Sequence, residues 1–195
     1  MTLDFRRLTG EALEASLEDV ARLRMTVFAE WPYLYAGTFD YEHRYLQSYR
    51  DNAGAVLVGA FDGTRLVGAA TGTPMEDHAS DFAEPFKTVG IPLEHIFYCA
   101  ESVLLPEYRG QGAGHHFFDH REAKARELGR KYSAFCAVIR PHDHPARPSG
   151  YRPLDGFWRK RGYEMLDGAV ARFKWTDHGH AEQTEKPLQF WIKEL

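Results

Sequence analysis

The chain has 195 residues, of which 44% are hydrophobic and 27% are charged, a composition typical of a globular domain that buries a full core. Its formal net charge is −4, so we expect no general basic surface for nucleic acid or anionic lipid. The first residues contain no apolar signal core, and no apolar run has the length of a membrane span. We therefore expect one cytoplasmic domain over residues 1–195.

The N-terminal part predicts two helices separated by an aromatic segment. Ser16, followed three residues later by Asp19, resembles a capping box, and the apolar residues from there to Phe28 fall on one helical face. The segment 31–37 has the composition of an aromatic turn, and a second, short helix is predicted at 41–49. We expect the first helix to begin near Ser16.

A β-hairpin and a connector are predicted next. Two apolar, β-rich runs at 55–61 and 65–73 flank an Asp-Gly dipeptide at 62–63, which is a strong signal for a two-residue hairpin turn. Residues 74–93 contain three prolines and a cluster of charges. They predict a connector with one helical turn at 82–87.

The most informative stretch joins a strand, a glycine-rich loop and a helix. Residues 95–105 have strand composition, and a proline ends the strand because it cannot donate to a ladder. Gly110, Gly112 and Gly114 lack Cβ, so their amides can approach a ligand closely, and Arg109 adds a positive charge. A helix is predicted from Gly114 onward. Because a helix N-terminus favours negative charge, the stretch predicts a phosphate cradle.

The spacing of the loop residues separates three kinds of phosphate cradle. A P-loop needs Gly-Lys, which occurs nowhere in the chain, and a dinucleotide fingerprint needs glycine where His115 stands. The pattern Arg/Gln-x-x-Gly-x-Gly/Ala directly after a strand is met by Arg109, Gly112 and Gly114. In the stretch Leu104-Leu105-Pro106-Glu107-Tyr108-Arg109-Gly110-Gln111-Gly112-Ala113-Gly114 the sequence resembles the GNAT superfamily of acetyl-CoA-dependent N-acetyltransferases.

The resemblance implies a fold, a co-substrate and a binding site. The implied fold class is α/β (α+β), with a central mixed, mostly antiparallel twisted sheet that is splayed at one parallel pair and flanked by helices on both faces. The implied co-substrate is acetyl-CoA, whose pyrophosphate contacts the loop while its pantetheine arm follows the strand. The residues expected to hold it are Val103, Leu104, Arg109, Gly110, Gln111, Gly112, Ala113 and Gly114.

The C-terminal part predicts a parallel strand, a long loop, a helix and two final strands. Residues 132–139 form a buried strand that should run parallel to 95–105, giving a right-handed βαβ unit. The loop 140–152 is followed by a helix that starts at Pro153 and ends near Gly162. Residues 170–175 and 188–192 alternate as an antiparallel pair. Cys99 and Cys136 lie inside predicted strands, so we expect core thiols.

One carboxylate is the candidate general base. Strict alternation places Glu101 on one strand face with Phe97, Cys99, Val103 and Leu105, where it is the only charge. A carboxylate in such surroundings is desolvated, which favours proton removal from an amine. The alternative is a buried glutamate paired with an arginine or a backbone donor.

The sequence departs from the family at the position of the usual general acid. Many GNAT enzymes have a tyrosine in the last helix that protonates the departing thiolate, and Trp158 stands at the matching position. Indole cannot deliver a proton at neutral pH. Trp158 either packs against the coenzyme or the acceptor, or belongs to the core. The alternative proton donors are water and two nearby tyrosines, Tyr151 and Tyr98.

Two segments are candidates for acceptor binding. Trp31, Tyr33 and Tyr35 either cap the core edge or line the acceptor pocket, and the resemblance favours the pocket. In the loop 140–152, three arginines are candidates for binding an acidic acceptor or the ribose phosphate of the coenzyme. His142 and His144 lack a third ligand at metal-site spacing, so we expect a surface loop and no metal. The three arginines are Arg140, Arg147 and Arg152.

The sequence thus predicts transfer of acetyl from acetyl-CoA to the amine of a small molecule, by direct attack in a ternary complex. Transfer of a larger acyl group, or transfer to a protein amine, stays open. From a different class, a coenzyme-sensing module without turnover is favoured by the missing helix tyrosine. Relatives of this kind commonly dimerise, and a homodimer through the last strands is a further expectation.

Overall fold

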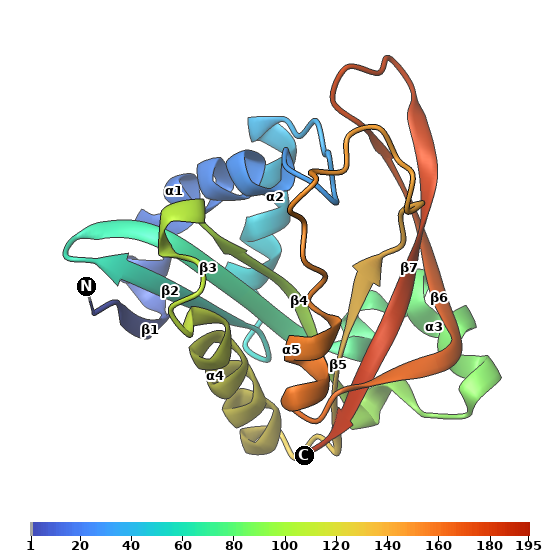
Figure 1. The fold of residues 1–195 in the computed structure, drawn as a ribbon. Helices are drawn as coiled ribbons and strands as arrows, with labels where there is room; N and C mark the ends of the chain where they lie inside the picture. Colours follow the sequence, from blue (N-terminus) through green and yellow to red (C-terminus); the bar gives the residue numbers. More distant parts are fainter. Residues whose placement is uncertain (1) are drawn as a thin grey trace.

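The computed structural model describes residues 2–195, which are built around one seven-stranded sheet (Figure 1). The strands are β1 (Asp4–Leu8), β2 (Val56–Asp62), β3 (Arg65–Pro74), β4 (Ile96–Leu104), β5 (Tyr132–Val138), β6 (Glu164–Thr176) and β7 (Gln183–Glu194). The helices are α1 (Gly10–Phe28), α2 (Phe39–Arg50), α3 (Ala79–Val89), α4 (Ala113–Glu127) and α5 (Asp155–Lys160). Short 3-10 turns are η1 (Met75–His78), η2 (Leu93–His95) and η3 (Pro106–Tyr108).

The sheet is mixed and mostly antiparallel. Its strand order is β1-β2-β3-β4-β5-β7-β6, and β4 with β5 is the parallel pair. That pair is short, because residues 96–98 align with 132–134 and no further rung follows among residues 2–195. Beyond Tyr98 the two strands diverge, as Figure 1 shows. The fold class and the splayed parallel pair expected from the sequence are confirmed.

Helices cover both faces of the sheet. On one face α1 and α2 pack over β2, β3 and β4 through a cluster that includes Leu17, Leu46 and Val103. Farther along the same face α3 packs on the strands at the C-terminal end, with Phe82 and Phe86 buried. On the other face α4 and α5 pack through a second set of apolar side chains. No helix in the described part of the chain, residues 2–195, is long and apolar enough to cross a membrane.

The predicted hairpin, the parallel strand and the final pair are confirmed, but two helices differ from their predictions. α1 begins at Gly10, and Ser16 lies within it, donating from Oγ to the carbonyl of Ala12 at 2.7 Å. The capping-box prediction is therefore wrong. The helix extends toward the N-terminus because Leu13 packs against the sheet together with Leu17, so burial outweighs the local capping signal.

The connector 74–93 is largely helical, which the sequence prediction missed. α3 continues from Ala79 to Val89 with Pro85 inside it, and Gly90 closes it at φ 69°. Phe82 and Phe86, four residues apart, are each 1% exposed. Their burial offsets the hydrogen bond that a proline removes from a helix. β1 was also missed, because in this edge strand Leu8 is the buried residue and little hydrophobic alternation is visible.

Candidate active site

An irregularity in β4 decides where Glu101 points. Thr71 of β3 pairs with Glu101, whereas Thr73 pairs with Tyr98, so two steps along β3 correspond to three along β4. One extra residue, at the Cys99–Ala100 step, forms a β-bulge. A bulge shifts the side-chain alternation by one position. The faces assigned by strict alternation are therefore wrong beyond Cys99.

The bulge places Glu101 over α1 and α2 and leaves Cys99 on the α4 face. Arg121 of α4 supports the distorted backbone, because its Nη1 donates to the carbonyls of Glu101 at 2.9 Å and Thr71 at 3.2 Å. Its Nη2 donates to Ser102 Oγ at 2.9 Å. Backbone carbonyls exposed by a bulge need such partners when they are buried.

Glu101 belongs to a buried charged cluster and is not alone among apolar side chains. Its Oε1 forms an ion pair with Nη1 of Arg24 from α1, and its Oε2 accepts a hydrogen bond of 2.9 Å from Tyr45 of α2. Nε of the same arginine donates to Oε2 of Glu42 at 2.5 Å. The side chains of Arg24, Glu42 and Glu101 are 8%, 0% and 10% exposed. The expectation of an isolated carboxylate is thus wrong, and the paired alternative describes its surroundings.

The phenols around this cluster keep their protons. Burial, followed by the fields of Cys136 and Glu101, raises the pKa of Tyr33 above its ordinary value. Burial likewise raises the pKa of Tyr98, whose hydroxyl lies 3.4 Å from Cys136 Sγ, and that of the Cys136 thiol to about 12. The phenols near Glu101 are therefore neutral, while Arg24 supplies the positive charge, and Cys99 and Cys136 are buried free thiols as expected.

The three aromatic residues of the segment 31–37 do not form one wall. Tyr33 packs on Phe28, with ring centroids 4.8 Å apart, and its pKa responds to Glu101, so it borders the charged cluster. Trp31 instead faces the loop 140–152, with its ring centroid 5.9 Å from that of Tyr151. Tyr35 lies on the side of α2, where burial and then Glu42 raise its pKa.

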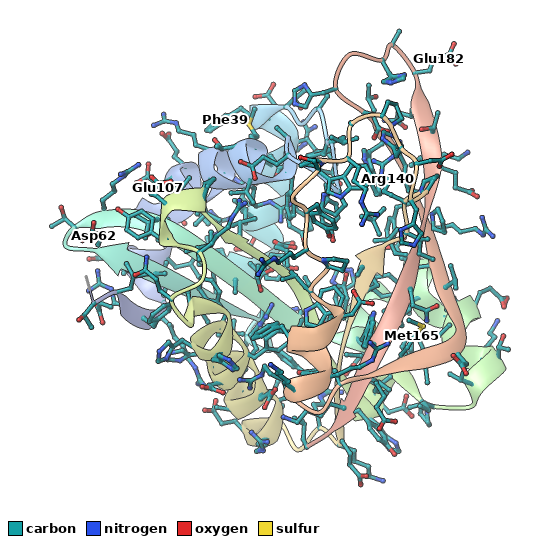
Figure 2. All side chains as sticks on the ribbon, in the orientation of Figure 1. Phe39, Asp62, Glu107, Arg140, Met165 and Glu182 are labelled. Atoms are coloured by element: carbon teal, nitrogen blue, oxygen red, sulfur yellow. The ribbon has the colours of Figure 1, made fainter. Side chains whose placement is uncertain are left out.

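Arg140 has a structural partner, which argues against its predicted role as an anion ligand. Its guanidinium donates to both oxygens of Asp177 at 2.8 and 2.9 Å, and to the carbonyls of Pro32 and Tyr33. Its side chain is 9% exposed, and Figure 2 shows it enclosed between the loop and the β6–β7 hairpin. Trp175 Nε1 donates to the same Tyr33 carbonyl at 3.0 Å. Arg140 therefore fastens the aromatic segment to the hairpin.

The glycine loop presents five successive amides. The N–H groups of residues 110–114 donate to no carbonyl or side chain within residues 2–195. Gly110 and Gly112 adopt φ 76° and 86°, which favours glycine, and Gly112 is the N-cap of α4. Gly114 serves packing, because a Cβ there would lie 3.0 Å from Phe157 of α5. The loop and the helix N-terminus together are a candidate anion site.

The side chains of the loop contact protein groups. Arg109 donates from Nε to the Leu104 carbonyl at 3.1 Å and from Nη2 to Glu30 Oε2 at 2.9 Å. Gln111 donates to the carbonyl of Glu107 at 3.4 Å. The guanidinium of Arg109, next to the glycine loop, is thus already ion-paired with Glu30.

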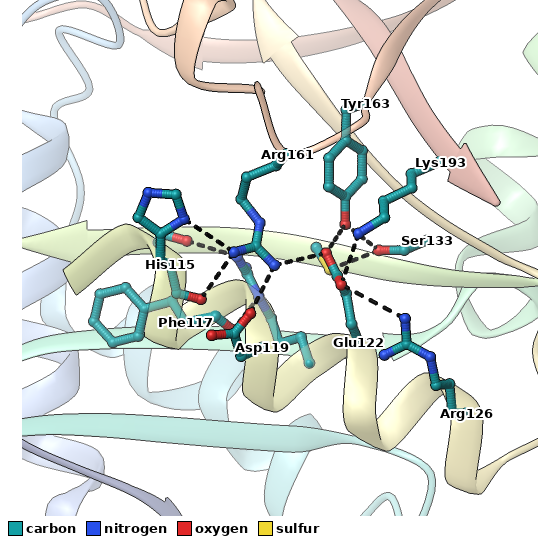
Figure 3. Close-up of polar contacts among 12 residues, drawn as sticks. His115, Phe117, Asp119, Glu122, Arg126, Ser133, Arg161, Tyr163 and Lys193 are labelled. Atoms are coloured by element: carbon teal, nitrogen blue, oxygen red, sulfur yellow. Dashed lines mark hydrogen bonds and ion pairs between the residues drawn. The ribbon is translucent and has the colours of Figure 1, made fainter. Parts of the chain in front are cut away.

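A second charged cluster holds α4 in place (Figure 3). Glu122 of α4 accepts from Arg161 at 3.1 Å, from the Tyr163 hydroxyl at 3.1 Å and from Lys193 of β7 at 2.9 Å. Arg161 also donates to Asp119 at 2.8 Å. These contacts fasten α4, whose N-terminus belongs to the candidate anion site, to the segment that follows α5 and to β7.

Trp158 has the surroundings of a core residue. Its ring centroid lies 4.9 Å from that of Phe135 and 5.2 Å from that of Trp191. Tyr151 is half-buried, and burial followed by Asp155 raises its pKa, so it retains a proton to donate. α5 begins at Asp155, so the predicted start at Pro153 lies two residues early.

The histidines of the long loop contact protein groups. His144 lies against Trp31, with ring centroids 5.0 Å apart, and His142 Nδ1 lies 3.0 Å from Arg147 Nη1. Among residues 2–195, no three His, Cys, Asp or Glu side chains converge as a metal site would require.

Several residues of the site were missed from the sequence, although a signal existed for some. Arg24 interrupts the apolar stripe of α1 at helical spacing from Val20 and Phe28, which indicates a buried charge. Glu42, Tyr45 and Tyr49 recur at three- and four-residue intervals and so share one face of α2. Arg121 and Glu30, in contrast, act on segments that are distant in sequence: Arg121 on the β3–β4 bulge and Glu30 on Arg109.

Comparisons with known proteins identify the family of this chain. The family model of the acetyltransferase (GNAT) family matches residues 17–151, whereas no curated protein matches the sequence. A ribosomal-protein-alanine N-acetyltransferase from Brucella melitensis is 17% identical with a TM-score of 0.65, over 98% of this chain and 99% of that chain. The structure of yncA from Salmonella typhimurium with its cofactor acetyl-CoA is 11% identical with a TM-score of 0.62, over 100% and 95%.

A third solved structure, provisionally described as a phosphinothricin N-acetyltransferase, is 14% identical with a TM-score of 0.62, over 100% and 99%. Identities this low show a shared fold. The family match covers more than half of the chain and includes the strand, the glycine loop and most of α1. The chain therefore belongs to the acetyltransferase (GNAT) family.

Proposed function

We propose that this protein transfers an acetyl group from acetyl-CoA to the amine of a small molecule, by direct attack in a ternary complex. The observation that carries the proposal is a run of five backbone N–H groups, residues 110–114, that have no acceptor within residues 2–195. They lie at the N-terminus of α4, beside the end of β4. Such a run fits a diphosphate, because each N–H donates to an anion and the helix dipole favours its charge.

The residues proposed to hold the coenzyme follow from this fit. The amides of Gly110, Gln111, Gly112, Ala113 and Gly114 surround the pyrophosphate, with the Arg109 guanidinium alongside. Beyond Tyr98 the backbone of β4 has lost β5 as a partner, which leaves an edge for the amide groups of the pantetheine arm.

Backbone groups of Val103 and Leu104 are the proposed contacts at that edge. When bound, acetyl-CoA supplies a thioester carbonyl that an amine can attack.

Glu101 is the proposed general base. Arg24 holds one of its oxygens, while the other, Oε2, accepts from Tyr45. Tyr33, whose pKa responds to Glu101, is proposed to contact the acceptor beside this carboxylate. The other proposed contacts with the acceptor are Trp31, Tyr35 and Trp158. A general base typically contributes about 100-fold or more to the rate.

A matched pair of variants separates a base from a structural ion pair. Glu101 and Glu42 are both buried and both paired with Arg24, so a structural role predicts similar effects for Glu101→Gln and Glu42→Gln. A catalytic role predicts that Glu101→Gln lowers kcat by about 100-fold or more with coenzyme binding retained, and that Glu42→Gln has a much smaller effect. Equal losses in both variants would reject Glu101 as the base.

Two alternatives remain in view. Another acyl group or a protein amine can replace acetyl or the small molecule, since variable loops form the acceptor site. A sensing module without turnover is favoured by Trp158, which packs in the core where a proton-donating tyrosine would otherwise stand.

A two-step experiment decides among them. Thermal unfolding with acetyl-CoA tests binding, and release of free thiol from acetyl-CoA is then followed with amino acids, arylalkylamines, polyamines, phosphinothricin and a peptide beginning with alanine. Stabilisation with thiol release from a small amine is expected. Release only with the peptide supports the protein substrate, and stabilisation without any release supports the sensing module. Absence of stabilisation would overturn the proposal.

A further inference from the structure

Two tyrosines of α2 connect Glu101 to a cavity on the side of α2. The Tyr45 hydroxyl donates to Glu101 Oε2 at 2.9 Å, and the hydroxyls of Tyr45 and Tyr49 lie 2.8 Å apart. Resting on the function proposed above, we propose that Tyr45 and Tyr49 form a relay that carries the proton removed by Glu101 to water in this cavity.

The cavity borders Tyr49, the last residue of the proposed relay. Its volume is about 90 Å³, and it is lined by the end of α2, by residues 52 and 55, by the end of β3 and by η1. A water needs roughly 10–15 Å³ of such space, so the cavity admits several. Tyr49 belongs to its lining, together with Ser48, Asn52, Ala55, Thr73, Asp77 and His78.

Proton acceptors stand in the cavity wall. Asp77 Oδ2 already accepts from Asn52 at 2.6 Å and from Thr73 at 2.9 Å, which leaves its second oxygen for water. Burial, opposed by nearby carboxylates, lowers the pKa of His78, which favours its neutral imidazole, and a neutral imidazole can accept a hydrogen bond from water in the cavity. A proton that leaves Tyr49 can therefore pass to water that is hydrogen-bonded to these groups.

The transfer balances at every step. While Glu101 is ionised, Tyr49 donates to Tyr45 and Tyr45 donates to Oε2. When Glu101 has taken a proton from the acceptor, the chain reverses: Glu101 gives its proton to Tyr45, Tyr45 gives its own to Tyr49, and Tyr49 gives its own to water. Each phenol is neutral before and after. Burial, then the field of Glu101, raises the pKa of both phenols, which favours this concerted exchange over a phenolate.

The groups packed around the relay determine which oxygen of Glu101 contacts Tyr45. Arg24 of α1 occupies Oε1 of Glu101 and lies 4.4 Å from the centroid of the Tyr45 ring, and Glu42 occupies another face of the same guanidinium. Tyr33, from the segment after α1, and His78 of η1 are the other titratable groups that sense Glu101. The Tyr45 contact at Oε2 thus links Glu101 to the cavity side.

Isosteric variants with a matched control test the relay. Tyr45→Phe and Tyr49→Phe each remove one hydroxyl, and Tyr41→Phe removes an exposed hydroxyl from the same helix. The assay is thiol release from acetyl-CoA with the fastest acceptor of the amine panel above, at several pH values and buffer concentrations. Thermal unfolding of each variant reports folding separately.

A relay predicts a distinct pattern. Tyr49→Phe should lower kcat by roughly 10-fold with KM for acetyl-CoA unchanged, because removing a proton-transfer step affects the rate and not coenzyme binding. Raising the concentration of a small buffer such as imidazole should restore much of the rate in Tyr49→Phe and leave the parent chain unaffected. The kcat of the double variant should be no lower than that of the slower single variant, because either substitution alone already interrupts the same proton path.

The outcomes separate the relay from the function on which it rests. If the parent chain turns over, and Tyr45→Phe and Tyr49→Phe match Tyr41→Phe, the relay is wrong and the proposed function stands. Rate losses that are additive and insensitive to buffer would also overturn the relay in favour of simple packing. No turnover by the parent chain with any amine would overturn the proposed function, and the relay with it.

Discussion

Arg109 Nη2 lies 2.9 Å from Glu30 Oε2, so the cation of the glycine loop is bound to a carboxylate two residues beyond the end of α1. The same guanidinium donates to the Leu104 carbonyl at 3.1 Å. Both partners of the ion pair are about half-exposed, at 45% and 42%. The segment that carries the aromatic residues and the loop proposed to bind the diphosphate are therefore joined by one exchangeable contact.

Removing the charge of Glu30 should tighten coenzyme binding. An exposed ion pair is worth about 0–1 kcal/mol, so Glu30→Gln is expected to lower the Kd for coenzyme A by up to about 5-fold. Titration calorimetry at low and high salt measures this, and the gain should shrink at high salt. Glu107→Gln, which alters an exposed carboxylate of the same loop 3.9 Å from Arg65, is the control. Weaker binding by Glu30→Gln would mean that the carboxylate orients Arg109 productively.

Adding a Cβ at Gly112 should abolish coenzyme binding. Gly112 has φ 86° and Gly63, in the β2–β3 turn, has φ 60°, and no atom lies within 4 Å of a Cβ built at either position. Both alanine variants should therefore lose about 1–2 kcal/mol of stability from backbone strain. Only Gly112→Ala should lose the thermal stabilisation given by coenzyme A. Equal stabilisation of both variants would place the diphosphate elsewhere.

Removing the guanidinium of Arg24 should unbalance the buried cluster. Arg24→Leu leaves Glu42 and Glu101 buried without their cation, and breaking such a pair costs about 3–5 kcal/mol. Urea unfolding measures the loss. Arg22→Leu, on the same helix with a side chain that is 66% exposed, should change stability by less than about 0.5 kcal/mol. A fully stable Arg24→Leu would contradict the buried pair.

Asp177 should make the fold sensitive to acid. Burial opposes the charge of Asp177, but hydrogen bonds from Arg140 and Lys186 outweigh it and lower the pKa of this carboxyl. The pKa of an aspartate in the unfolded chain is about 3.9. A carboxyl whose pKa is lower in the folded state stabilises the fold at pH values above this unfolded pKa. The contribution is lost as the pH falls through the pKa of the folded state.

The free energy of unfolding of Asp177→Asn should therefore fall below that of the parent chain at pH 7, and the difference should vanish in strong acid. Urea unfolding across this range checks the sign. Glu182→Gln, at the tip of the β6–β7 hairpin in Figure 2, should follow the parent chain. A difference that stays constant with pH would contradict the Asp177 assignment.

Local sequence signals predicted an element correctly where contacts between neighbouring residues determine its structure. The Asp-Gly turn predicted the β2–β3 hairpin, and the glycine-rich loop predicted the turn from β4 to α4, because both depend on neighbouring residues. α3 was underpredicted because Pro85 is a local signal, whereas Phe82 and Phe86 gain their stability from distant strands. For the same reason Ser16 misled the assignment of the start of α1.

What the sequence by itself determined is the family, the sheet with its parallel pair and the loop whose glycines expose their amides. These follow from short-range patterns of polarity and backbone freedom. Only the tertiary structure decided which way Glu101 points, since the bulge in β4 arises from pairing with β3 and from the support of Arg121 on another helix. It also decided the partners of that carboxylate, because Arg24 and Tyr45 reach it only when α1 and α2 pack on the sheet.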